Sequence, residues 1–420
     1  MPDLSPPSED NVNSCTTASV RRKKLTQEKN VRLMGKILEI DKCWRTTALQ
    51  RLMFENIESI DEVDGHISYS DFFNDFMLVN KPCLIEANLT ENWRCLSEWV
   101  DHTGSPNFEF LKRHFGNSVA PVADCNEQYF NAQKKQNMRV TDFLDYWRKY
   151  ALDGHPKDQP CLYLKDWHFV KEYPDYKAYH WPEIFRSDWL NEFCASENGG
   201  DDYKFVYMGP KGSWTPMHAD VLSSFSWSSN ICGRKKWILF PPGTEENLKS
   251  AHGDLPFQRD LSPEMTRGGI IIDQLAGQTI FVPSGWHHQV WNEEDTISIN
   301  HNWLNGCCIE GAWRNLLKGL RAVENELQDC KDMEGWLEQC QVVLKAVAGV
   351  DCKGFAAMLA YIANQRIAQI KKEEVQLGKE HTIFDLRKVL NVLESFGQNE
   401  ILNDVDTCDF KIFLDCLEKE

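Results

Sequence analysis

The chain has 420 residues and a formal net charge of −17. This charge argues against a dedicated nucleic-acid-binding protein, because such proteins bind phosphate groups mainly through Lys and Arg. No window approaches the roughly 18–20 consecutive apolar residues of a membrane-spanning helix. We therefore expect neither nucleic acid nor a membrane as a partner.

The cysteines and the N-terminus indicate a reducing compartment. The 15 cysteines are an odd number at scattered positions without any C-x-x-C pair, so neither a disulfide framework nor a finger-type zinc site is expected. The first residues, MPDLSPPSEDNVNSC, lack the apolar stretch of a secretory signal. We expect a cytoplasmic protein, with the nucleus as an alternative if RRKK at 21–24 acts as an import signal.

The N-terminal part, residues 26–200, has the pattern of helical and mixed α/β structure. It follows a polar, Pro- and Ser-rich tail at 1–25, which we expect to be disordered. Helix formers dominate 26–58, and this segment predicts one or two helices.

Three segments of this part predict particular elements. Residues 67–87 predict a helix followed by a strand, because the residue before Pro82 is disfavoured in a helix. Residues 139–150 have helical periodicity, with Thr141 as the expected N-cap. The aromatic-rich segment 161–169 predicts a strand.

Residues 201–305 consist of short strand-like runs separated by turns that contain Gly and Pro. The runs are YKFVYMG, SFSWSSNIC, KKWILF, GGIIID, QTIFVPS, HHQVWN and TISINHNW, and their density predicts a β-barrel or sandwich. Residues 306–420 are predicted to be helical, since apolar residues in WRNLLKGLRAVENEL recur at steps of three and four. We expect these helices to form a packed bundle, with a homodimer interface as the alternative.

Candidate metal ligands occur on two predicted strands of the β region. The run WTPMHAD contains His218 and Asp220, which as residues i and i+2 of a strand would point to the same face. The run SGWHHQV offers a third ligand, either His287 or His288, since alternation lets only one of them face the metal. Two histidines and one carboxylate form the facial triad of non-haem Fe(II), which leaves positions open for substrate and dioxygen.

Four stretches carry a resemblance to a known family. They are YLKDW at 163–167, YMGPKGSWTPMHAD at 207–220, CGRKKWILFPPG at 232–243 and FVPSGWHHQVWNEEDTISINHNW at 281–303. In this order they resemble the jumonji-C oxygenases, which use Fe(II), 2-oxoglutarate and O2. The resemblance implies a mainly β core, a double-stranded β-helix (jelly-roll, cupin-like) barrel, decorated by N-terminal helices and a C-terminal helical bundle.

The resemblance also implies roles for single residues. FVPSGWHH matches the family motif Pro-x-Gly-Trp-x-His with His288 as the metal ligand, beside His218 and Asp220. The family lysine that binds the remote carboxylate of 2-oxoglutarate matches Lys235, rather than its neighbour Lys236.

Further co-substrate residues follow from the same resemblance. Thr215 and Tyr163 match family residues whose hydroxyl groups hydrogen-bond the remote carboxylate. Asn302 matches a family asparagine that lines the pocket near the metal.

One family position is not matched. Many relatives have an asparagine between the H-x-D motif and the Gly-x-Lys turn, where it contacts the metal-bound end of 2-oxoglutarate. This chain reads SFSWSSN there. The offset from Gly233 indicates Ser228 or Ser226, with Asn230 nearby as a third candidate.

The chain as a whole is similar to a small member of the family that is implied to be a protein lysyl hydroxylase. The resemblance implies hydroxylation of a lysine in the peptide-chain release factor that recognises stop codons, with release of succinate and CO2. One alternative is a methyl-lysine (histone) demethylase with the same iron chemistry. Asp220 argues against it, because many such demethylases carry Glu at that position. The other alternative is a non-catalytic cupin-like scaffold.

Overall fold

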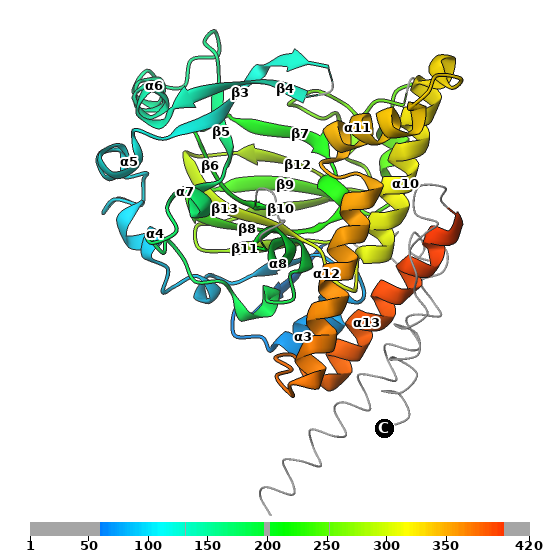
Figure 1. The fold of residues 1–420 in the computed structure, drawn as a ribbon. Helices are drawn as coiled ribbons and strands as arrows, with labels where there is room; N and C mark the ends of the chain where they lie inside the picture. The colour runs from blue at the N-terminus through cyan, green and yellow to red at the C-terminus, as the bar shows by residue number, and fades with distance from the viewer. Residues whose placement is uncertain (1–58, 131, 197–201, 252, 399–420) are drawn as a thin grey trace, which may run out of the picture. The chain divides into compact units, whose positions relative to one another are not determined.

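Two β-sheets form the core of this computed structural model, which describes residues 59–130, 132–196, 202–251 and 253–398 (Figure 1). The predictions for residues 1–58, which are the tail, the helices at 26–58 and the RRKK signal, lie outside the described residues.

The strands are β1 (Asp61–Val63), β2 (Cys83–Ile85), β3 (Val119–Tyr129), β4 (Ala132–Arg139), β5 (Leu162–Trp167), β6 (Lys204–Gly209), β7 (Trp214–His218), β8 (Phe225–Cys232), β9 (Lys235–Phe240), β10 (Ile270–Gln274), β11 (Thr279–Val282), β12 (His287–Asn292) and β13 (Thr296–Trp303). The larger sheet has the order β1-β2-β11-β8-β13-β6-β5-β3-β4, and the smaller sheet has the order β10-β9-β12-β7.

The strands from β6 onward are shared between the two sheets. β6, β8, β11 and β13 lie in the larger sheet, and β7, β9, β10 and β12 make up the smaller one. Their pairings are antiparallel. This is the arrangement of a double-stranded β-helix, so the predicted jelly-roll barrel is confirmed.

The burial of the strands follows from their place in the sheets. Every residue of β8 and β11 is buried, as expected for strands covered on both faces. The edge strand β10 alternates between buried and exposed residues, because only one of its faces packs on the core.

The predicted helix and strand at 67–87 are confirmed. Helix α3 (Tyr69–Phe72) continues as a π-helical turn to Met77. The chain then leaves the helix through Asn80, which has a positive φ of 55°, and enters β2. β2 pairs with β11, so this N-terminal segment extends the sheet that carries the barrel.

The predicted N-cap at Thr141 is wrong. Helix α6 spans Val140–Leu152, its N-cap residue is Arg139, and that residue makes no side-chain cap bond. The Thr141 amide instead donates to the carbonyl of Gly116 at 3.0 Å. A backbone carbonyl at the end of α5 (Phe108–Phe115) therefore supplies the acceptor that a capping side chain would otherwise provide.

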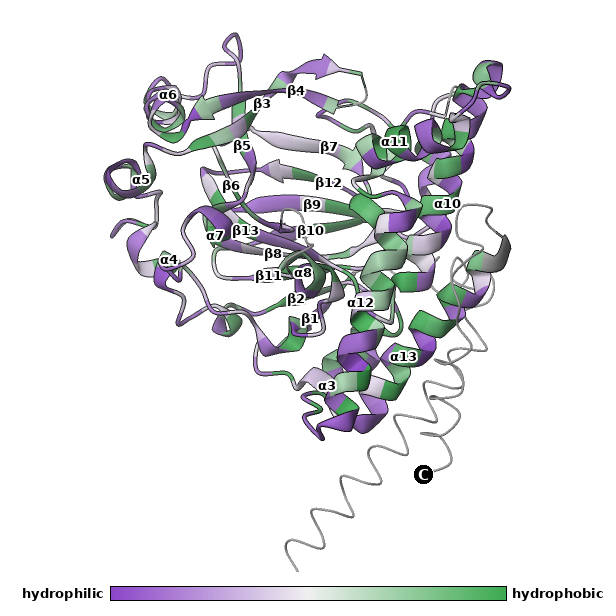
Figure 2. Cartoon of the chain, in the orientation of Figure 1, coloured by the Kyte–Doolittle hydropathy of each residue, from purple (hydrophilic) through white to green (hydrophobic). Residues whose placement is uncertain are grey.

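The remaining helices outside the C-terminal region are α4 (Arg94–Glu98), α5 (Phe108–Phe115), α7 (Phe169–Glu172), α8 (Trp189–Cys194) and α9 (Pro263–Thr266). The C-terminal helices are α10 (Ile309–Glu326), α11 (Trp336–Ala348), α12 (Cys352–Lys371) and α13 (Lys379–Glu394), and they lie together at one side of the sheets (Figure 1). Each carries hydrophobic and hydrophilic residues, as Figure 2 shows, so one face packs while another meets solvent. None of the described helices is long and apolar enough to cross a bilayer.

Candidate active site

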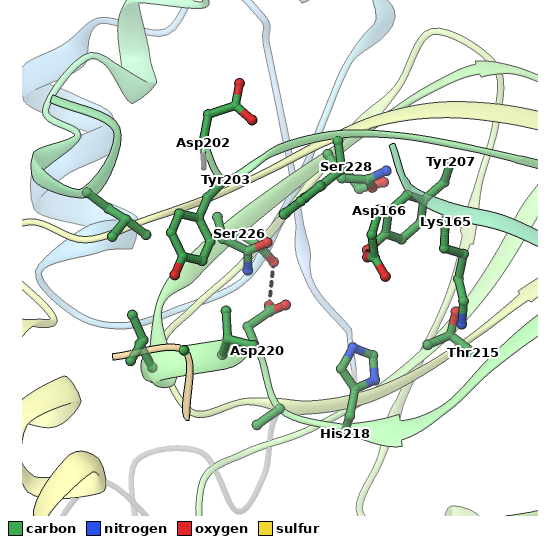
Figure 3. A pocket seen from close by; sticks show the side chains of 18 of the residues that line it. Lys165, Asp166, Asp202, Tyr203, Tyr207, Thr215, His218, Asp220, Ser226 and Ser228 are labelled. Carbon is green, nitrogen blue, oxygen red and sulfur yellow. Dashed lines mark hydrogen bonds between the residues drawn. The ribbon is translucent and has the colours of Figure 1, made fainter. Parts of the chain in front are cut away.

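A cavity of about 1130 Å³ lies between the two sheets (Figure 3). Its walls carry residues of β4, β5, β6, β8 and β13 on one side and of β7, β9 and β12 on the other, and helices including α8 and α12 also contribute. All the site residues predicted from the sequence line this cavity: Tyr163, Thr215, His218, Asp220, Ser228, Lys235, His288 and Asn302.

Three predicted metal ligands meet at one point of the cavity. One ligand atom from each of His218, Asp220 and His288 lies within 4.8 Å of the other two. β7 and β12 pair so that His218 stands opposite His288, and the two ring centroids are 4.3 Å apart. The cross-strand register thus joins residues that are far apart in the sequence.

Both histidines are oriented so that Nε2 is the available ligand atom. His218 Nδ1 lies 2.8 Å from the carbonyl oxygen of Pro216, and His288 Nδ1 lies 3.2 Å from that of Trp286. A neutral imidazole that donates from Nδ1 keeps its lone pair on Nε2. Burial, followed by the neighbouring His218, lowers the pKa of His288 to about 4, so this ring is neutral at neutral pH.

Asp220 lies just beyond β7, which differs from the expectation that it shares a strand with His218. β7 ends at His218, and Asp220 is the N-cap of a 3-10 turn at Val221–Ser223. Leu222 in this turn has a positive φ of 57°. Ser226 Oγ donates to Asp220 Oδ2 at 2.6 Å, the dashed line in Figure 3, which leaves Oδ1 for a metal.

The second histidine of the doublet, and not the first, joins this cluster. His287 faces the other way, and its Nδ1 lies 3.7 Å from Glu245 Oε2. Two imidazoles and one carboxylate are the donors that non-haem iron prefers. Since the cluster lies on the cavity wall, the remaining positions of an ion would be open to the cavity, and the residues present fit the metal.

Lys235 gives the cavity a buried cation. Its side chain is only 2% exposed, and its Nζ donates to Ser298 Oγ at 2.9 Å and to the hydroxyl of Tyr163 at 3.3 Å. Burial lowers the pKa of Lys235 to about 7. A buried ammonium group with neutral partners is costly unless an anion joins it, so this wall fits a carboxylate of 2-oxoglutarate.

The turn before Lys235 explains why this lysine and not its neighbour enters the cavity. Gly233 has a positive φ of 71°, and a Cβ there would overlap the carbonyl oxygen of Asp295, so the tight turn requires glycine. β9 then begins at Lys235, and Lys236 lines a separate, smaller cavity on the other face of this strand.

Thr215, Tyr163 and Asn302 also face the cavity. Thr215 comes from β7 in the smaller sheet, and Tyr163 comes from β5 in the larger one. The side-chain amide of Asn302 donates to Ser224 Oγ at 3.1 Å, which fixes its orientation. The walls therefore present hydroxyl groups from opposite sheets to one ligand.

The three candidates for the unmatched family position have different surroundings. The amide of Asn230 donates to the carbonyl of Gly233 at 2.8 Å, and Ser226 is engaged by Asp220. The buried Ser228 hydroxyl faces the cavity and has no hydrogen-bond partner among the described residues. This orphaned hydroxyl is where a bound co-substrate would find a free donor.

Two polar cavity residues were not predicted from the sequence although a signal existed. Lys165 follows Tyr163 by two residues on β5, and Asn300 precedes Asn302 by two residues on β13. Period-two alternation places each of them on the face of its predicted neighbour.

Asp166 is another cavity residue that was not predicted, and no local sequence pattern indicates it. It lies where the register between β5 and β6 shifts, and its φ is +57°. Its carboxylate accepts from Tyr207 at 2.6 Å and from Lys135 at 2.5 Å. The irregularity turns an extra residue into the cavity, and strand alternation does not predict it.

Comparison with known proteins agrees with this geometry. The family described as "JmjC domain, hydroxylase" matches residues 205–303. The chain is 43% identical over 380 residues to "2-oxoglutarate and iron-dependent oxygenase JMJD4" of Danio rerio, covering 84% of this chain and 90% of the relative. It is 40% identical over 323 residues to "Arginine-specific demethylase JMJ20" of Arabidopsis thaliana, covering 71% and 69%. It is 29% identical over 282 residues to "Bifunctional arginine demethylase and lysyl-hydroxylase psr-1" of Caenorhabditis elegans, covering 62% and 65%.

Proposed function

This chain belongs to the JmjC family of 2-oxoglutarate- and iron-dependent oxygenases, and we propose that it hydroxylates a lysine side chain of a peptide-chain release factor. We choose lysine because the part of the cavity beyond the triad combines apolar walls with a carboxylate. The choice of a release factor rests on the resemblance of the whole sequence to a lysyl hydroxylase.

The walls beyond the triad suit a long aliphatic side chain. They are formed by α8 and α12 through apolar and aromatic residues: Leu190, Phe193, Phe355, Met358 and Tyr361. Such walls favour the methylene stem of a lysine, whose charged end then needs a polar partner. Asp202 lines the same cavity, and its Oδ1 accepts from His168 Nδ1 at 2.7 Å. Its carboxylate has lone pairs left for an ammonium group.

Iron and 2-oxoglutarate, when bound, supply the oxidation: 2-oxoglutarate and dioxygen are converted to succinate and CO2, and one oxygen atom enters a C–H bond. The chain's own residues determine where this happens. His218, Asp220 and His288 would hold the metal, and Lys235 with Tyr163 would hold the co-substrate. The apolar walls would orient the lysine stem and exclude bulk water from the reacting carbon.

The charge of the chain supports a basic protein partner. Its net charge of −17 attracts positively charged surfaces and speeds their encounter. A release factor acts in the cytoplasm, which is the location expected for this chain.

Demethylation of a methylated lysine or arginine is the second candidate function. The names of the Arabidopsis and Caenorhabditis relatives both include arginine demethylase, and the second also includes lysyl-hydroxylase. Demethylation uses the same metal and co-substrate. The non-catalytic scaffold is set aside, because the chain belongs to a family of oxygenases.

The products separate these functions. The purified chain is incubated with Fe(II), 2-oxoglutarate and the release factor, and the digested release factor is analysed by mass spectrometry. A hydroxylase adds one oxygen atom to an unmethylated lysine, and the His218→Ala variant leaves the mass unchanged. Release of formaldehyde from methylated peptides, without oxygen on unmethylated lysine, would favour the demethylase.

A further inference from the structure

A second buried lysine faces the same cavity as Lys235. Lys165 lies two residues after Tyr163 on β5 and lines the cavity with it. It is only 6% exposed, and Figure 3 shows it among the side chains that line the cavity. The roles described so far do not use it.

The contacts of Lys165 hold it against the wall where 2-oxoglutarate is expected. Its Nζ donates to Gln133 Oε1 at 2.8 Å, and Gln133 Nε2 donates to the carbonyl of Trp214 at 3.0 Å. Trp214 immediately precedes Thr215 on β7. The hydrogen bonds therefore link the ammonium group, through Gln133, to the backbone of the residue that precedes Thr215.

The two lysines approach the same aromatic ring. Lys165 Nζ lies 5.4 Å from the ring centroid of Tyr163, and Lys235 Nζ lies 6.0 Å from that centroid. Both ammonium groups thus approach Tyr163, whose hydroxyl is assigned to the remote carboxylate.

Neither ammonium group has a carboxylate partner among the described residues. Lys165 donates to an amide oxygen and Lys235 to hydroxyl groups, while the nearby carboxylate of Asp166 is taken by Lys135 and Tyr207. Burial lowers the pKa of Lys165 to about 8. Two buried cations with neutral partners destabilise an empty cavity and favour an anion in it.

We propose that Lys165 is a second cationic anchor for the remote carboxylate of 2-oxoglutarate, and that with Lys235 it sets the preference of the pocket for a 2-oxo dicarboxylate over a 2-oxo monocarboxylate. A carboxylate has about four lone-pair sites, so it accepts from two ammonium groups and from Tyr163 and Thr215. This role goes beyond lysine hydroxylation and does not depend on the identity of the protein substrate.

The test measures binding, without any protein substrate. The full chain is loaded with Mn(II), and the dissociation constants of 2-oxoglutarate and 2-oxopentanoate, which lacks the remote carboxylate, are measured by calorimetry. In Lys165→Met, 2-oxoglutarate is expected to bind about 10-fold to 100-fold more weakly, as for the loss of a charge-assisted hydrogen bond. Binding of 2-oxopentanoate is expected to change less than about twofold, because it makes no such bond. Lys165→Arg keeps the charge and is expected to retain part of the preference.

Two control variants distinguish a ligand-binding role of Lys165 from a purely structural one. Lys236→Met removes a lysine from the opposite face of β9 and is expected to leave both constants unchanged. Gln133→Ala removes the neutral acceptor, and the anchor role predicts that the preference for the dicarboxylate persists. Equal weakening of 2-oxoglutarate and 2-oxopentanoate binding in Lys165→Met would overturn the proposal. Loss of the preference for the dicarboxylate in Gln133→Ala, combined with an unchanged preference in Lys165→Arg, would also overturn it. So would unchanged 2-oxoglutarate binding in Lys165→Met.

Discussion

The hydroxyl of Ser226 donates to Asp220 Oδ2 at 2.6 Å, so the one carboxylate of the triad is held by a residue of the facing sheet. Partners that orient a metal ligand contribute to metal affinity. We expect Ser226→Ala to weaken Fe(II) binding about 10-fold to 100-fold with the histidines intact. Calorimetry with Mn(II) in place of iron checks this, and Ser229→Ala on the same strand, away from the triad, is the control.

The doublet at 287–288 gives a test of strand register. His288 lies opposite His218, while His287 faces Glu245. We expect His288→Ala to lose metal-dependent turnover of 2-oxoglutarate by about 10³-fold or more, since one of three protein ligands is missing. His287→Ala is expected to keep turnover within about threefold. The reverse result would mean that the metal site uses the other face of β12.

Binding of 2-oxoglutarate is expected to depend on pH through Lys235. Burial lowers its pKa to about 7, so its ammonium form prevails below that pH and is lost as the pH rises. Because only the charged form attracts the carboxylate, affinity should fall above pH 7 by up to about tenfold per pH unit. Titration of the Mn(II)-loaded protein between pH 6 and 9, using roughly one-unit steps, checks this. Lys235→Arg stays charged throughout, so any remaining fall in affinity should begin near pH 8, where Lys165 loses its charge. A fall that still began near pH 7 in this variant would assign the effect to another group.

Asp202 provides a test of the proposed substrate chemistry. If its carboxylate pairs with the substrate ammonium group, Asp202→Asn should lower kcat/KM for a lysine peptide about tenfold, as expected for a partly buried ion pair. The acetyl-lysine analogue of that peptide has no charge, so its poor turnover should not fall further. Asp153→Asn, an exposed aspartate outside the described cavity wall, is the matched control. Equal loss with both peptides would assign Asp202 a structural role.

The barrel and the triad were predictable because both depend on local patterns. The strand runs at 203–303 follow from period-two alternation, and the choice of His218, Asp220 and His288 follows from the family motifs. The same alternation, applied to Tyr163 and Asn302, would also have found Lys165 and Asn300.

The features that could not be predicted depend on tertiary contacts that no local sequence pattern encodes. Asp220 leaves the strand because the next residues form a turn with Leu222 at positive φ. The N-cap predicted at Thr141 is replaced by a backbone carbonyl of Gly116, a residue brought close only by the tertiary fold. Asp166 enters the cavity through a shift in the pairing of β5 and β6. Bulges and loop contacts of this kind are set by the whole sheet.

The most direct test of the central claim, lysine hydroxylation at this iron site, measures two products in one reaction. The purified chain is given Fe(II), 2-oxoglutarate, O2 and the release factor, and succinate and oxidised lysine are quantified together. We expect equal amounts of succinate and of a single lysine carrying one added oxygen atom, and neither product above background with Asp220→Ala. Wild-type succinate formation with no oxygen on any lysine of the release factor would contradict the account.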